Sequence, residues 1–339
     1  MSRMVVCLSI LSLVFGVAVA SARDVTLDDI RRAIEEQGAN WRAEATTVWQ
    51  RSDSELAEMM GGALEPVDAE MYVVDDPYYM PMSRAQFDWR NNGGNWMTPV
   101  TNQGCNDCWA HASCGAQEAA MNIALNDPDA DWNMSEQFLI SCGFNCNAQY
   151  LNNVLNYLRD TGTVRETCFP YSGSYNPPYC SDRCANWSYD LWNINSYGYT
   201  PNGDVGQMKS QLANGPMIVW MNVYSDFLTY SGGVYEHTSG SSMGGHFVVL
   251  VGYNDDDPEG ACWICKNSWG TGWGEDTYGL SGEAGYFRIA MGSNESGIET
   301  YPTFITQSMP DFSVPATGPI GLALLLAGLS GLLFIRRRA

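Results

Sequence analysis

The pattern of apolar residues changes partway along the chain. Residues 109–126 are rich in Ala, Met, Ile and Leu and are followed by Asp127-Pro128, which predicts one long, mostly buried helix. Shorter helices are predicted at 135–140 and 151–158. After about residue 190, short apolar runs between Gly and Pro residues predict strands, at 217–220, 247–251 and 286–289. A helical first half and a strand-rich second half favour an α+β fold with two lobes.

Residues 23–80 form a separate segment ahead of the globular region, which we place at 81–310. Apolar residues within 27–34 share one helical face, and those within 56–60 predict a second short helix. Gly61-Gly62 and the acidic, Pro-containing stretch at 75–77 separate this segment from the globular region.

The first 22 residues are typical of a secretory signal peptide. Arg3 gives a positive start, residues 4–20 are apolar, and Ala18-Val19-Ala20 offers small residues for cleavage. A membrane anchor is the alternative, but the apolar run is short and ends in small residues. We therefore expect an exported protein, located at the cell surface or outside the cell.

Residues 311–339 form a tail in three parts. The motif Val314-Pro315-Ala316-Thr317-Gly318 precedes an apolar stretch at 320–335, and three Arg residues follow at 336–338. A helix of that length spans about 24 Å, slightly short of a ~30 Å hydrocarbon core. The layout resembles bacterial surface-sorting signals, and the motif is close to the Leu-Pro-x-Thr-Gly of sortase substrates. It implies an at least transient membrane anchor at 320–335 and a sortase- or exosortase-like processing partner, with a plain tail anchor as the alternative.

Composition narrows the class of protein. The 339 residues are 45% hydrophobic and carry 17 basic against 38 acidic side chains, a net charge of −21. A chain this acidic is a poor ligand for phosphate backbones, so we expect no nucleic-acid partner. Eleven Cys residues favour an oxidising compartment, in agreement with export.

The candidate chemistry centres on one thiol and one imidazole. Cys108 lies at the predicted start of the long helix, where the helix dipole favours a thiolate. The chain has only three His residues, of which His246 follows Gly244-Gly245 and opens a predicted strand. Asn267 follows another apolar run, with Trp269 close behind it, and is a candidate to orient the His246 ring.

These residues lie in blocks that resemble papain-like cysteine peptidases, the cathepsin family. The segments that carry the resemblance span about residues 87–303 and occur in the family's order: Phe87-Asp88-Trp89-Arg90, Asn102-Gln103-Gly104-Cys105-Asn106-Asp107-Cys108-Trp109-Ala110, Met134-Ser135-Glu136-Gln137-Phe138-Leu139, Gly232-Gly233-Val234-Tyr235 and Asn267-Ser268-Trp269-Gly270-Thr271-Gly272-Trp273-Gly274. His246 follows Cys108 by 138 residues, as the family's spacing requires.

The resemblance implies a papain-like two-lobe fold, with the long helix central in the helical lobe, a β-barrel-like second lobe and the active site between them. It implies a secreted or surface-attached peptidase that hydrolyses peptides or proteins without a cofactor or metal. Cys108 is then the nucleophile, His246 its base, and Asn267 the residue that orients His246. Gln103 would stabilise the oxyanion, and Trp109 and Trp269 would support the site. The segment 23–80 becomes an inhibitory propeptide.

Several positions depart from the family's pattern. Gln103 lies five residues before Cys108 rather than six, which predicts an altered oxyanion hole. Asp107 stands directly before Cys108, where its carboxylate would raise the thiol pKa or bind a substrate amine. The family's Cys-Asn-Gly-Gly segment, which pairs with the substrate backbone, is Cys146-Asn147-Ala148-Gln149 in this chain. We assign the substrate-backbone contacts to Asn147, Ala148, Gln149 and Gly245, without a side-chain preference.

The resemblance also implies the disulfides Cys105–Cys146 and Cys142–Cys180, with Cys168–Cys184 as a plausible local pair. Cys114, Cys262 and Cys265 are then left over. Cys262 and Cys265 are three apart on a predicted strand and face opposite sides, so we expect buried free thiols there.

Three other classes of protein were weighed. The spacings Cys105-x-x-Cys108 and Cys262-x-x-Cys265 are those of zinc or redox motifs. Residues 240–244 fit the serine hydrolase pattern G-x-S-x-G, but no helix is predicted to follow. Gln103 and Asp107 allow a catalytically impaired surface-binding protein. His111, three residues after Cys108, is interpreted as a packed side chain between the lobes rather than a base or ligand.

Overall fold

The computed structural model describes residues 23–64, 84–130, 132–174, 176–280 and 283–307. The predicted signal peptide 1–22, residues 65–80 of the N-terminal segment and the tail 311–339 lie outside the described residues. The helices are α1 (Leu27–Gln37), α2 (Asp53–Ala57), α3 (Cys108–Leu125), α4 (Glu136–Phe138), α5 (Leu151–Asp160) and α6 (Val205–Leu212). The strands are β1 (Trp41–Ala43), β2 (Gly62–Ala63), β3 (Gln86–Asp88), β4 (Gln149–Tyr150), β5 (Ser196–Tyr199), β6 (Met217–Tyr224), β7 (Tyr230–Tyr235), β8 (Ser242–Asn254), β9 (Cys262–Lys266), β10 (Tyr286–Ala290) and β11 (Thr303–Thr306).

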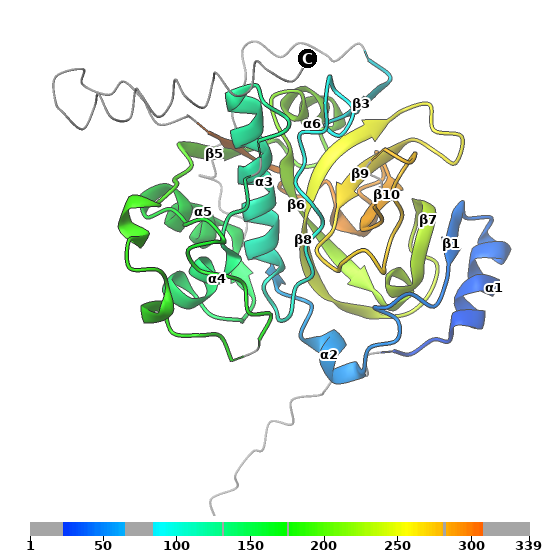
Figure 1. Ribbon diagram of the computed structural model, residues 1–339. Helices are drawn as coiled ribbons and strands as arrows, with labels where there is room; N and C mark the ends of the chain where they lie inside the picture. The colour runs from blue at the N-terminus through cyan, green and yellow to red at the C-terminus, as the bar shows by residue number, and fades with distance from the viewer. Residues whose placement is uncertain (1–22, 65–83, 131, 175, 281–282, 308–339) are drawn as a thin grey trace, which may run out of the picture.

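The long helix α3 is the centre of the molecule. Figure 1 shows it between the helices α4 and α5 on one side and the sheet on the other. Fourteen of its 18 residues are buried, because it is covered on both sides. Asn126 ends it in the left-handed conformation (φ 52°), and its backbone N–H bonds back to the carbonyls of the last turn. The predicted helix and the α+β class are confirmed.

Nine strands form one sheet in the order β1-β7-β10-β9-β8-β6-β11-β5, with β3 paired to β8. The neighbours pair antiparallel, apart from β7 and β10, which run parallel. Strand β8 is the longest, and its Phe247 to Asn254 are all buried, with α3 on the side of the helical lobe. The predicted strands at 217–220, 247–251 and 286–289 are confirmed within β6, β8 and β10.

The expected barrel is not seen as a closed ring. Among the described residues, the sheet has two ends, β1 and β5, which lie on opposite sides of the ladder. A barrel requires the first and last strands to pair. One end is instead formed by β1, which belongs to the N-terminal segment and pairs antiparallel with β7.

The N-terminal segment packs on the outer side of the sheet. Helix α1 begins at a capping box in which the Thr26 side chain and Asp29 each bond to the other's backbone N–H. Trp41 of β1 stacks on Tyr230, with ring centroids 6.4 Å apart, and meets Tyr235 edge-on at 5.2 Å. The segment therefore extends the aromatic core of the second lobe.

Two details differ from the sequence-based expectation. The second N-terminal helix ends at Ala57, so Met59 lies in the turn that follows it and Met60 just beyond that turn. His246 does not open its strand but lies inside β8, which begins at Ser242.

None of the helices that the structure describes is both long and apolar enough to cross a bilayer.

Candidate active site

Cys108 is the first residue of α3 and lies where the helix meets the sheet. Its thiol is completely buried. The backbone N–H of Phe247 on β8 points at the sulfur, with 3.5 Å between nitrogen and Sγ. This contact brings the helix start next to His246, the residue before Phe247, although the two lie far apart in the sequence.

His246 is held by groups that follow strand β9. Its Nε2 lies 2.7 Å from Oδ1 of Asn267. The Asn267 oxygen also accepts a hydrogen bond of 2.8 Å from the backbone N–H of Ser268, which fixes the amide orientation. Trp269 is 1% exposed, and its ring centroid lies 4.8 Å from that of His246, so it shields the pair from water. The Nδ1 atom of His246 is buried and has no hydrogen-bond partner among the described residues.

Both reactive groups are neutral in this state. Burial and, to a smaller extent, the Asp107 carboxylate raise the pKa of the Cys108 thiol to about 12, since backbone hydrogen bonds from Phe247 and Gly61 only partly offset them. Burial also lowers the pKa of His246 to about 4, although its hydrogen bond to Asn267 acts in the opposite direction. The thiolate that the helix start was expected to favour is therefore not the stable form while the site is covered.

Gln103 lies beside the start of α3 despite its shorter spacing. Its side-chain NH₂ donates to the carbonyl of Cys105 at 2.9 Å and to that of Met59 at 3.1 Å. Its Oε1 accepts a hydrogen bond of 2.8 Å from the Ser268 hydroxyl. This contact orients the amide so that its NH₂ group faces the site. The N–H groups of Gln103 thus point to a carbonyl of the N-terminal segment.

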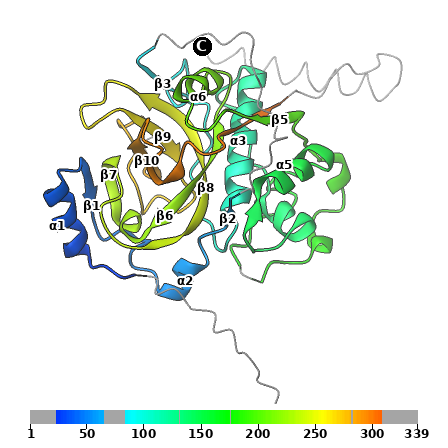
Figure 2. The same ribbon diagram turned by 180° about the vertical axis from the view of Figure 1, so that it is seen from behind.

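That segment covers the thiol. The backbone of Gly61 makes a hydrogen bond to the Cys108 thiol. A Cβ atom on Gly61 would come within 2.1 Å of the Asn106 carbonyl oxygen. Gly62 is equally confined, because a Cβ there would lie 2.7 Å from the backbone nitrogen of His246. Figure 2 shows the strand that follows, β2, beside one end of α3. Only glycine allows the chain to pass this close.

The residues predicted to bind substrate lie along the same path. Strand β2 pairs parallel with β4, and the Gln149 N–H donates to the Gly61 carbonyl at 3.1 Å. Gly245 faces Gly62 from the other side, since a Cβ on Gly245 would meet the Gly62 oxygen at 2.1 Å. Asn147 and Ala148 are exposed next to β4. The sequence analysis missed Trp220, whose indole N–H donates to the Gly62 carbonyl at 3.1 Å.

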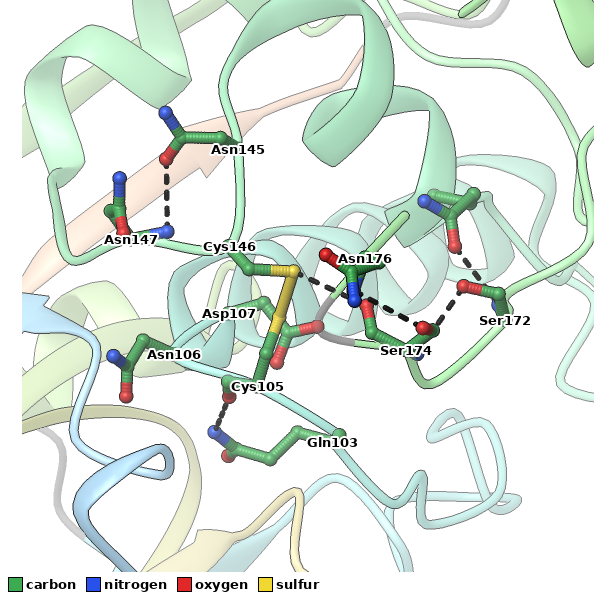
Figure 3. The surroundings of a disulfide bond; sticks show 12 residues. Gln103, Cys105, Asn106, Asp107, Asn145, Cys146, Asn147, Ser172, Ser174 and Asn176 are labelled. Atoms are coloured by element: carbon green, nitrogen blue, oxygen red, sulfur yellow. Dashed lines mark hydrogen bonds between the residues drawn. A yellow bond between two sulfur atoms is a disulfide. The ribbon is translucent and has the colours of Figure 1, made fainter. Parts of the chain in front are cut away.

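A disulfide fixes the loop that carries the thiol. Cys105 is bonded to Cys146, as Figure 3 shows, with Gln103 and Asp107 on either side. The Trp109 indole N–H donates to the carbonyls of Asn106 and Asn147 at 2.9 and 3.1 Å. These contacts tie the start of α3 to the segment before β4.

The other cysteines fall into two groups. The structure also contains the disulfides Cys142–Cys180 and Cys168–Cys184. Cys114, Cys262 and Cys265 are free and buried. Because Cys105 is paired with Cys146 and Cys108 is free, Cys105-x-x-Cys108 is neither a zinc nor a dithiol motif here. Within the described ranges, no group of three or more His, Cys, Asp or Glu side chains could hold a metal ion.

The remaining sequence candidates take structural positions. Ser242, the central residue of the G-x-S-x-G match, lies at the start of β8 and donates to Asn222 at 2.6 Å, with no helix after it. Asp107 is fully buried and accepts from the Tyr171 hydroxyl at 2.6 Å, so it does not face a substrate in this structure. Gly61 and Gly62, which the sequence predicts as a break in the chain, instead allow a close backbone approach to the site, for which two adjacent glycines are also a signal.

Comparison with known proteins gives the family. A model described as papain family cysteine protease matches residues 83–306, well over half of the chain. The chain therefore belongs to the papain family of cysteine proteases.

Curated relatives agree with this assignment. Cathepsin B-like CP2 of Giardia intestinalis is 38% identical over 221 residues, a match that covers 63% of this chain and 71% of the relative. Cathepsin B-like cysteine proteinase 4 of Caenorhabditis elegans is 31% identical over 252 residues, which covers 63% of this chain and 72% of the relative.

Similar solved structures include precursor forms. ProCathepsin B S9 from Trypanosoma congolense matches with a TM-score of 0.72 at 22% identity, over 84% of this chain and 99% of that one. Digestive procathepsin L2 from Tenebrio molitor larval midgut matches with a TM-score of 0.68 at 27% identity, over 83% of this chain and 88% of that one. The protein is accordingly a papain-family cysteine peptidase with the papain-like fold, and its N-terminal segment has counterparts in procathepsins.

We predict that Cys108 in the full chain resists alkylation by iodoacetamide at pH 7. A pKa of about 12 leaves on the order of one thiolate in 10⁵ at that pH, and the sulfur is also buried. We expect modification at least ~100-fold slower than in the urea-unfolded chain, measured by mass spectrometry of the Cys108 peptide. Equal rates in the folded and unfolded chain would contradict the covered, neutral thiol.

Proposed function

We propose that this peptidase cleaves peptide bonds through Cys108, His246 and Asn267, and that residues 23–80 keep it inactive as a zymogen. The observation that carries the proposal is the arrangement of three groups from separate elements. The thiol at the start of α3 adjoins β8 beside His246, and His246 lies 2.7 Å from Asn267. Thiol, base and orienting amide are the three parts that nucleophilic catalysis by cysteine requires.

The chemistry follows from these positions. Once the site is open, His246 takes the proton of Cys108, and the sulfur attacks the substrate carbonyl carbon. The Gln103 amide N–H groups stabilise the oxyanion. The C–N bond breaks, the imidazolium gives its proton to the leaving amine, and a thioester remains on Cys108. Water, deprotonated by His246, then hydrolyses the thioester and restores the thiol.

The N-terminal segment inhibits by occupying the places of substrate. Met59 offers its carbonyl to the Gln103 amide, and Gly61 and Gly62 bond to Cys108, Gln149 and Trp220. A peptide or protein substrate would use the same donors: the Gln103 side-chain amide, the Gln149 backbone N–H and the Trp220 indole N–H. We therefore assign substrate-backbone contacts to Gln149, with Asn147, Ala148 and Gly245 around it.

Local polar contacts add to the attachment of the segment, although both parts of the chain are acidic. Residues 23–80 and 81–310 carry net charges of −9 and −15, so their attraction must be local. Arg42 meets Glu259 at 3.2 Å and Glu275 at 3.7 Å. The hydroxyl of Ser225 donates to the Asp24 carboxylate and lowers its pKa, more than the slight burial raises it. A lowered pKa means that this contact stabilises the docked segment above pH ~4 and is lost as pH falls below it.

Export and processing complete the proposal. The signal-like start 1–22 directs the chain out of the cytoplasm into an oxidising compartment. The three disulfides are stable there. The motif at 314–318, the apolar stretch 320–335 and the Arg cluster place the tail at the membrane, with the basic residues on the cytoplasmic side. A sortase- or exosortase-like enzyme then cleaves within the motif and leaves the peptidase at the cell surface.

The first prediction on function concerns the nucleophile. Cys108→Ala should abolish peptide hydrolysis, because losing the covalent route removes most of the ~10⁶-fold or larger acceleration. Cys114→Ala is the matched control, a buried free thiol on the same helix. It should keep activity near that of the wild type. Activity above about a tenth of the wild-type value in Cys108→Ala would reject the role of Cys108.

The second prediction concerns the zymogen. Gly61→Val should make the full chain active at pH 7 without prior acid treatment, because the new side chain collides with Asn106 and displaces the segment. Ala57→Val adds similar volume at an exposed position and should stay inactive until acidified. Both would be assayed on a fluorogenic peptide at pH 4 and pH 7. A Gly61→Val chain as inactive at pH 7 as the control would refute inhibition by this segment.

The third prediction concerns the tail. Processing between Thr317 and Gly318 should leave a surface-linked protein whose sequence ends at Thr317. Mass spectrometry of the C-terminal peptide from a surface extract measures this. A tail that reaches Ala339 in most of the protein would favour the plain anchor.

A further inference from the structure

A buried carboxylate stands next to the nucleophile. Asp107 is the residue before Cys108 and is 0% exposed. Its Oδ2 accepts from the Tyr171 hydroxyl, while its Oδ1 has no hydrogen-bond partner among the described residues. A negative charge at this position opposes formation of the Cys108 thiolate, which is one of the causes that raise the thiol pKa.

His111 lies one turn along α3, on the same face as Asp107. Its Nε2 is 3.7 Å from Oδ2 of Asp107, and its Nδ1 is 3.2 Å from Oε1 of Glu136 on α4. The imidazole is buried between the two carboxylates, with the Tyr171 ring edge-on at 4.9 Å. An imidazole between two buried carboxylates is stabilised in its protonated form. Burial alone would lower the pKa of His111, but Glu136 and Asp107 together raise it to about 10.

Other charged groups surround this triad. Glu166 interacts with both His111 and Glu136, and the Tyr171 N–H donates to its carboxylate at 2.6 Å. Glu118 and Lys266 lie on the sheet side, where Lys266 donates to Thr98, which in turn donates to Glu118. Two further titratable neighbours are the buried thiol of Cys114, which interacts with Glu136, Glu118 and Glu166, and His246, whose pKa a charged His111 lowers. Acidic groups outnumber basic ones around the thiol, so the charge on His111 matters.

We propose that His111 is a positioning residue: an imidazolium held between Asp107 and Glu136 whose charge offsets that of Asp107 and keeps the adjacent thiol ionisable. The inference rests on the proposed role of Cys108 as nucleophile. His111 touches neither substrate nor the reacting atoms and acts through Asp107.

Two features argue against other roles. The cavity that His111 lines with Glu118, Glu136 and Lys266 has a volume of about 10 Å³, the space of about one water molecule, so it cannot take a ligand. A neutral imidazole that served only as packing would leave the buried Asp107 carboxylate without a cation beside it, because Lys266 interacts with Glu118 and Glu136 instead, and a buried charge without a partner is costly. Asp107 in turn bonds through Tyr171 to the Gly104 N–H at 2.7 Å, which links the charge pair to the loop that carries Gln103.

The test is the pH dependence of Cys108 alkylation. Each full-length variant is first activated by acidification to pH 4 in the same way as the wild type, and alkylation of the Cys108 peptide is then followed by mass spectrometry across a range of pH. His111→Gln keeps a polar side chain but removes the charge. We expect it to raise the thiol pKa by about one unit, which slows alkylation about tenfold below that pKa. The kcat of peptide hydrolysis should fall with it, whereas KM should change little.

Removal of the charges on both Asp107 and His111 should return the thiol pKa to near its wild-type value. Asp107→Asn keeps an acceptor for Tyr171, and in the double variant with His111→Gln we expect alkylation within about twofold of the wild-type rate. A role in packing alone predicts no such rescue. If His111→Gln fails to fold, Asp107→Asn takes its place, because loss of the Asp107 charge leaves the imidazolium paired with Glu136 alone and should lower the thiol pKa and speed alkylation about threefold below it.

A matched control removes another histidine–carboxylate pair. His237 lies 3.2 Å from Asp226 in the sheet lobe, and His237→Gln should leave the thiol pKa unchanged. An unchanged thiol pKa in His111→Gln, or in Asp107→Asn, would overturn the proposal. Failure of the proposed function is distinguishable, because it would show as activity retained in Cys108→Ala, whereas alkylation reports the thiol directly.

Discussion

The contact between the start of α3 and strand β8 is the constraint on which the rest of the structure depends. Helix α3 is covered on both sides, so its axis is fixed, and its first residue meets the backbone N–H of Phe247. That single contact places a thiol of one lobe beside an imidazole of the other. Asn267 and Trp269 then hold the His246 ring, and Gln103 lies beside the start of α3.

Burial and charge compete at this contact. Burial raises the pKa of Cys108 to about 12 and lowers that of His246 to about 4, so the covered pair is neutral. The helix dipole contributes ~1 kcal/mol, which is less than the about 1.4 kcal/mol that corresponds to one pKa unit. It is therefore too weak to reverse the effect of burial on the Cys108 pKa. Under the proposed function, exposure of the thiol is therefore the step that changes the charge states of this pair.

The N-terminal segment is bound mainly by shape and local contacts rather than by net charge. Trp41 joins the aromatic core, β1 extends the sheet, and two glycines pass the thiol at distances that no other residue allows. Ion pairs from Arg42 add to this at the surface, where each contributes little. A segment attached in this way is released by loss of several weak contacts, which makes it suitable for a switch.

The sequence by itself determined the α+β class, the long helix and the strands of the second lobe, because apolar spacing follows local backbone geometry. It also identified Cys108, His246 and Asn267 as candidates, since motif spacing carries that information. Only the tertiary structure decided that Asp107 is buried against Tyr171, that His111 lies between two carboxylates, and that Gly61 covers the thiol. These contacts join residues from separate elements, and their energies depend on burial, which the order of residues along the chain does not give.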